Sequence, residues 1–64
     1  MQSIEQRLIA AARHVKNVST VEEAIRVFSE KTGRLTDAQI QDAAALARAG
    51  TVPPCATPFI ERFA

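Results

Sequence analysis

The sequence predicts an all-α protein, a small three-helix bundle with a proline-linked, short C-terminal helical turn, within a single domain of residues 1–64. A hydroxyl residue is followed three positions later by Glu or Gln at three places, which is the pattern of a capping box. Apolar residues at helical spacing follow each of these pairs. Two adjacent prolines then end the helical pattern. The three capping pairs are Ser3 with Gln6, Thr20 with Glu23, and Thr36 with Gln39.

The first helix is expected over about residues 3–16. Ile4, Leu8 and Val15 share one face with the alanines between them, at spacings of three and four residues. Asn17 is expected to end the helix. Basic residues gather near that end, where the negative pole of the helix dipole favours cations, and this account is preferred to the alternative of contact with an acidic protein surface or nucleic acid. These residues are Arg13, His14 and Lys16.

The second helix is expected over residues 20–32. Ser19 with Glu22 forms a competing capping box one residue before that of Thr20, so the start is uncertain by one position. Gly33 is placed to take the left-handed conformation that closes a helix. The apolar face consists of Val21, Ala24, Ile25 and Phe28.

The third helix is expected over residues 36–49. Leu35 before the cap and Ile40 within the helix have the spacing of a hydrophobic staple, and Gly50 supplies the stop. The helix is rich in alanine, whose small side chain permits close packing of neighbouring helices. Its alanines are Ala38, Ala43, Ala44, Ala45, Ala47 and Ala49.

Residues 51–57 are expected to form a semi-rigid strap, because consecutive prolines remove amide donors and hold the chain extended. Thr57 as cap and Pro58 at the first helical position then predict a terminal turn over residues 58–64. Two of the three phenylalanines of the chain, Phe59 and Phe63, lie in this turn.

The terminal turn allows two interpretations. It can fold back on the three helices and supply the large side chains that an alanine-rich core lacks. Alternatively, it can dock in a groove of another chain, or exchange between two copies of this one. In the second case the candidate partner-binding residues are Phe59, Ile60, Arg62 and Phe63.

A helix-turn-helix DNA-binding regulator is the alternative function, because the second and third helices are joined by a short turn containing Gly33. The expected recognition helix opposes this interpretation, since Asp37 and Asp42 lie on it. The candidate DNA-contacting residues are Arg34, Gln39, Gln41 and Arg48.

Composition excludes several classes of protein. The single cysteine, Cys55, forms no intrachain disulfide, which indicates a reducing compartment, and one cysteine with the single histidine, His14, makes a poor zinc site. No apolar run has the 18 or so residues that a membrane span needs, so we expect a cytoplasmic protein without membrane contact. No catalytic, metal-binding or cofactor motif is present, so we expect neither an enzyme nor a bound cofactor.

The function favoured by the sequence is stoichiometric protein binding, by a small non-enzymatic regulator, adaptor or inhibitor. By size it is analogous to modulators encoded by phages and prokaryotic mobile elements. A chain of 64 residues buries only just enough apolar surface to offset the entropy of ordering its backbone. A homo-oligomer, with a dimer favoured, is therefore expected.

Overall fold

The computed structural model describes the backbone of residues 2–63 and the side chains of residues 2–62. The described chain is all-helical, which confirms the predicted fold class. Its elements are α1 (Ile4–Ala12), α2 (Val21–Thr32), α3 (Asp37–Arg48) and α4 (Thr57–Phe63).

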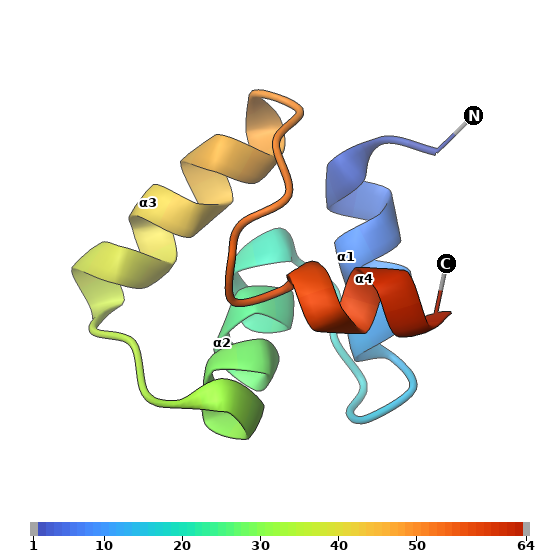
Figure 1. The fold of residues 1–64 in the computed structure, drawn as a ribbon, viewed down its shortest axis with the longest axis horizontal. Coiled ribbons are helices and arrows are strands. Elements are labelled where there is room, and N and C mark those ends of the chain that lie inside the picture. Colours follow the sequence, from blue (N-terminus) through green and yellow to red (C-terminus); the bar gives the residue numbers. More distant parts are fainter. Residues whose placement is uncertain (1, 64) are drawn as a thin grey trace.

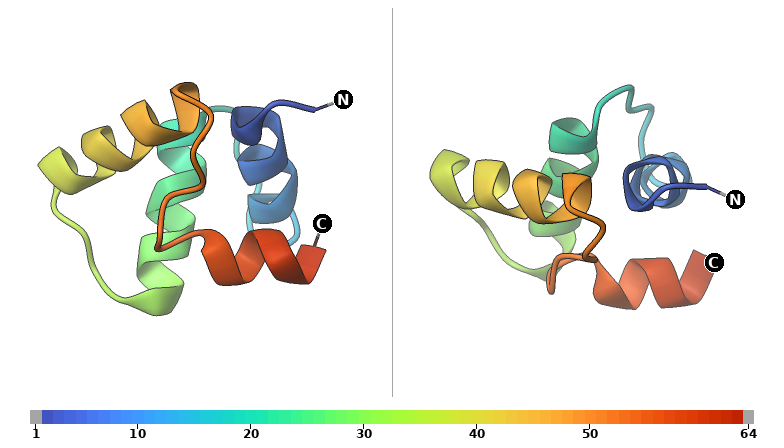
Figure 2. Two further views of the ribbon diagram at one scale, coloured as in Figure 1. Left: turned by 45° about the horizontal axis from the view of Figure 1, so that its top comes forward. Right: turned by 90° about the horizontal axis from the view of Figure 1, so that it is seen from above.

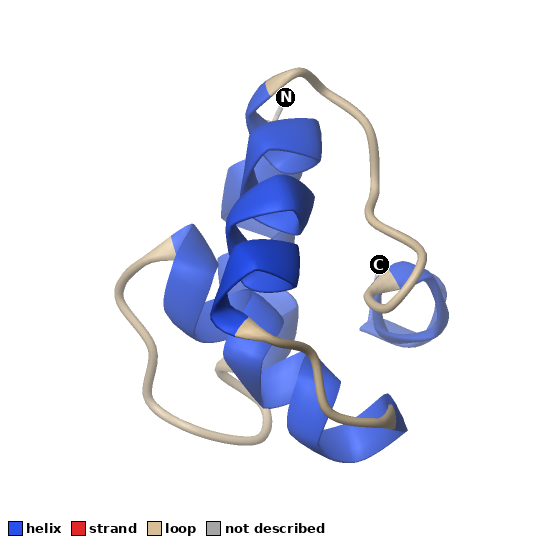
Figure 3. Ribbon diagram, turned by 90° about the vertical axis from the view of Figure 1, so that its left-hand side faces the viewer, coloured by secondary structure: helices blue, strands red, loops and turns tan. Residues whose placement is uncertain are grey.

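The helix α2 is central: it packs against α1 on one side and against α3 on the other (Figure 1). The helix α4 crosses below α1, at the opposite end of the molecule from the last turn of α3 (Figure 2). Residues 49–56 connect the two, leaving the end of α3 and running back along the molecule to α4 (Figure 3). The strap, which the structure limits to residues 51–56 of this connection because α4 begins at Thr57, therefore covers one side of the bundle.

Complete capping boxes start α1 and α3, as predicted. The Gln6 amide donates to Ser3 Oγ and the Ser3 amide donates to Gln6 Oε1, both at 3.2 Å. At α3, the Gln39 amide donates to Thr36 Oγ1 at 3.2 Å and the Thr36 amide donates to Gln39 Oε1 at 2.9 Å. Two amides that a helix start leaves open are satisfied each time.

The start of α2 is arranged differently. The Glu23 amide donates to Thr20 Oγ1 at 3.2 Å, so Thr20 is the cap, as expected. The Glu23 carboxylate, however, accepts a hydrogen bond from the amide of Ser19 at 3.0 Å instead of completing a box with Thr20. The competing box of Ser19 with Glu22 does not form either, because Glu22 turns to an ion pair with Arg48.

The first helix is shorter than predicted and ends at Ala12. The amide of His14 donates to the carbonyl of Ala11, a tighter turn than an α-helix makes. The Arg13 Nε donates to the Val18 carbonyl at 3.1 Å and holds the following loop against the helix end. Val18 is consequently only 3% exposed, whereas Val15, which the helical pattern places on the apolar face, is 43% exposed.

The ends of α2 and α3 lie within a residue of their predicted positions. Gly33, at φ 135°, and Gly50, at φ 91°, follow these helices in backbone conformations that residues with a β-carbon rarely adopt.

The core lies between the helices and includes part of the strap and α4. Phe59 stacks on Phe28 of α2, with ring centroids 4.7 Å apart and an interplanar angle of 27°. Ala56 and Ile60 are buried in the same apolar cluster. The terminal helix therefore packs on its own bundle, the first of its two interpretations. The largest fully buried side chains are Phe28, Leu8, Ile25, Ile40 and Pro53.

Candidate functional site

Leu46 is a large apolar residue that is not buried in the core. It lies in the last part of α3 beside the buried residues Ala43 and Ala47, and 43% of its surface remains exposed. Among the described residues only Val15 is another large hydrophobic residue exposed to this degree. Val15 lies alone in the loop after α1, whereas Leu46 lies in a groove.

This groove, the α3–strap groove, has a volume of about 250 Å³ and a mostly apolar lining. One wall is a face of α3, and the other is formed by residues of the strap. Its principal lining residues are Leu35, Asp42, Leu46, Pro53, Pro54 and Cys55.

Both walls of the groove are held in place. The strap begins with the Thr51 amide donating to the Leu46 carbonyl at 2.9 Å. Pro53 is fully buried, and its carbonyl accepts hydrogen bonds from the Ala56 amide at 3.0 Å and from Thr57 Oγ1 at 3.2 Å. Two prolines further restrict the backbone. The groove is therefore formed before anything binds, and a ligand need not order it.

The charge in the groove comes from Asp42. Its exposed carboxylate has no hydrogen bond or ion pair to any described residue. The other acidic residue of α3, Asp37, pairs with Arg26 at 3.3 Å. No lysine or arginine lines the groove. The groove is therefore an apolar surface with one negative charge that no described residue neutralises.

Cys55 is half-buried at the strap wall. Burial raises the pKa of its thiol above the usual value, and a backbone hydrogen bond lowers it by a smaller amount. The thiol is protonated at neutral pH and is a poor nucleophile. Within the described part of the chain, no group of three or more His, Cys, Asp or Glu side chains is placed to hold a metal ion.

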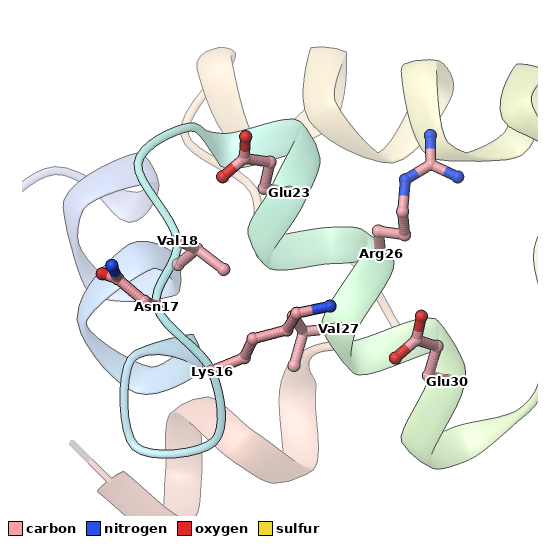
Figure 4. Close-up of a pocket in the computed structure, with 7 residues that line it drawn as sticks. All are labelled: Lys16, Asn17, Val18, Glu23, Arg26, Val27 and Glu30. Carbon is pink, nitrogen blue, oxygen red and sulfur yellow. The ribbon is translucent and has the colours of Figure 1, made fainter.

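A second hollow, of about 330 Å³, lies between the loop after α1 and α2 (Figure 4). Its apolar lining comes from the buried residues Val18 and Val27, and Lys16 extends across it toward α2. Arg26 points away toward α3, where it pairs with Asp37. Glu23 and Glu30 also line this hollow, and the Glu23 carboxylate accepts the hydrogen bond from the Ser19 amide.

The predicted partner-binding residues of the terminal turn lie on α4. Ile60 is 6% exposed, and Phe59 is half-buried against Phe28. Arg62 lies on the exposed side of the helix, and the side chain of Phe63 lies outside the described residues. The described apolar face of α4 is thus in contact with the chain's own core.

The predicted DNA-contacting residues do not form a basic face. Arg48 pairs with Glu22, and its Nε lies 3.8 Å from Glu5 Oε2, so two carboxylates neutralise it. Gln39 completes the cap of α3, while Arg34 and Gln41 are exposed at separate positions. Arg48 instead ties α3 to the first turns of α1 and α2.

Comparison with known protein families, curated proteins and solved structures finds no match to this chain. No helix in the described part of the chain is both long enough and apolar enough to cross a membrane.

The α3–strap groove was not predicted from the sequence. One signal for it was present: Leu46 is a large apolar residue that does not lie in phase with Ile40, Ala44 and Ala47. That signal shows where α3 has spare apolar surface, but the second wall depends on where the strap returns. No local pattern predicts that position.

Proposed function

We propose that this chain is a small, non-enzymatic protein-binding module that acts as a regulator, adaptor or inhibitor through the α3–strap groove. The observation that carries the proposal is Leu46, which is exposed within a preformed apolar groove instead of being buried. Exposed apolar surface bordered by polar residues is typical of protein-interaction sites. A cytoplasmic location, favoured by the single free cysteine, belongs to the same proposal.

The chemistry of the groove supports binding in preference to catalysis. A catalytic site needs a nucleophile, base or acid within reach of an oriented partner group. In the α3–strap groove the thiol of Cys55 keeps its proton, and no histidine lies beside it. Besides apolar contact, the groove presents the Asp42 carboxylate and the side chain of Gln39, whose Oε1 caps α3.

DNA binding by α2 and α3 is the second candidate, and the short connection between these helices favours it. Against it, the exposed surface of α3 carries Asp42, and its one arginine, Arg48, is paired with carboxylates. Phosphate contacts supply most of the affinity of such proteins and need free cations. A gel shift with random duplex DNA tests this candidate, and salt-sensitive retardation would favour it.

Affinity capture from the native host's lysate, with matched variants, tests the proposed function. We expect the wild type to retain one protein in equimolar amount, Leu46→Ser to lose it, and Val15→Ser to keep it. Leu46 and Val15 are equally exposed, at 43% each, so the pair controls for general loss of surface hydrophobicity. Retention by both variants, or recovery of nucleic acid instead of protein, would argue against the proposal.

A further inference from the structure

We infer that the α3–strap groove takes a basic amphipathic helix of a different protein, whose aliphatic side chain packs beside Leu46 and whose lysine or arginine pairs with Asp42. This inference rests on the proposed function and adds the chemistry of the partner. It depends on the shape of the groove, on its charge, and on what a second copy of this chain can offer.

The shape of the groove suits a helical segment. The groove borders one face of α3 from Gln39 to Leu46, and Pro53 with the turn at residues 54–56 forms its other wall, so the lining extends along the axis of α3. A volume of about 250 Å³ accommodates only one or two anchoring side chains. An amphipathic helix presents such anchors three or four residues apart along one face, with polar residues beside them.

The charge of the groove specifies which polar residue lies beside the anchors. A docked apolar segment takes water away from the Asp42 carboxylate, which has no partner among the described residues. Removing water from an unpaired carboxylate costs free energy, whereas a lysine or arginine on the incoming helix forms a charge-assisted hydrogen bond with it. An acidic or neutral helix leaves the carboxylate unpaired, so Asp42 selects against it.

The same charge excludes a second copy that docks by a symmetric contact through this groove. In a two-fold contact the same residues meet from both sides, so two Asp42 carboxylates would approach each other. No lysine or arginine lines the groove to neutralise them. A symmetric pair of copies is therefore disfavoured at this groove, and the inferred partner is a different protein that carries the missing cation.

Selection from a displayed library of random helical peptides, with the immobilised full-length protein as target, tests the inference. We expect the enriched peptides to share a bulky aliphatic residue and a lysine or arginine within one helical turn of it. Replacing that cation by glutamine should weaken binding to the wild type about tenfold, as for a charge-assisted hydrogen bond. The Asp42→Asn variant should bind both peptides equally, at the weaker affinity. Asp42 is exposed, so this variant keeps the fold, which circular dichroism verifies.

The outcomes separate the inference from the proposed function. Peptides that bind the wild type and Asp42→Asn equally well, but not Leu46→Ser, would overturn the basic partner and leave the groove as a binding site. Peptides that bind Leu46→Ser as well as they bind Val15→Ser would overturn the groove itself. Failure to enrich any peptide, or self-association that Leu46→Ser abolishes, would overturn the inference as well.

Discussion

A hydroxyl side chain determines where each of the first three helices begins. Ser3, Thr20 and Thr36 each accept a hydrogen bond from the third helical amide, so the chain changes there from extended to helical backbone. The acceptor is three residues away from its donor and needs no tertiary contact. These positions were therefore predictable from the sequence alone.

We expect Thr36→Ala to lower the free energy of unfolding by about 1 kcal/mol, because it leaves the Gln39 amide without its acceptor. Thr51→Ala is the matched control, since the exposed Thr51 bonds through its backbone amide, which alanine keeps. Urea denaturation followed by circular dichroism measures both variants. An equal loss in the two would show that the cap contributes nothing specific.

Phe59 contributes to stability through its contact with Phe28. We expect Phe59→Ala to destabilise the protein by about 2 kcal/mol or more, from lost burial and the lost ring stack. Glu61→Ala, on the exposed side of the same helix, should change the free energy of unfolding little. If the melting temperatures of the two variants agreed, the stack would not hold α4 in solution.

Cys55 should make stability depend on pH in the alkaline range. Burial raises the pKa of its thiol, so the folded chain keeps this proton to a higher pH than the unfolded chain does. The contribution of Cys55 to stability is therefore complete below the pKa of the unfolded thiol and is lost as pH rises through the folded value. Cys55→Ser should remove this dependence.

The pH profile of iodoacetamide alkylation, followed by mass spectrometry, checks the direction of the shift. We expect the midpoint for Cys55 to lie at higher pH in the native protein than in denaturant. The midpoint, and not the absolute rate, is the relevant quantity, because burial alone slows the reaction. Coinciding midpoints would contradict the prediction.

At the scale of elements, α4 and the strap are part of the core. Pro53, Ala56 and Ile60 are buried, and the aromatic ring of Phe59 covers that of Phe28. The sequence predicted a terminal helix from Thr57 and Pro58, but it left open whether its apolar face contacts this chain or another. A helix of seven residues is too short to be stable in water by itself, so its location is decided by tertiary contact.

We expect truncation after Pro53 to abolish cooperative unfolding and to lower helix content beyond the loss of α4 itself. The remaining helices would expose apolar surface that Ala56 and Ile60 now cover. Circular dichroism and thermal melting of the truncated and full-length chains measure the effect. A truncated chain with an unchanged melting temperature would show that α4 is not part of the core, and would favour docking of the tail to another chain.

At the scale of the whole molecule, the core of the described residues lies between the chain's own helices and strap. Its accessible surface of 4157 Å² is close to the roughly 4,000 Å² expected for a monomeric protein of this mass. The homodimer favoured by composition stays a prediction, and exchange of α4 between two copies is the route the fold offers. Light scattering measures the mass, and a mass of one chain at micromolar concentration would contradict the dimer.

The sequence by itself determined the local features of this protein: three capped helix starts, two glycine stops and a proline strap, each set by residues within a few positions of one another. The tertiary structure decided which apolar residues are buried against other parts of the chain. It ended α1 early and buried Val18 in place of Val15, and it packed α4 on its own bundle. It also left Leu46 in a groove beside Asp42, because the position of the strap relative to α3 depends on buried contacts between residues far apart in the chain.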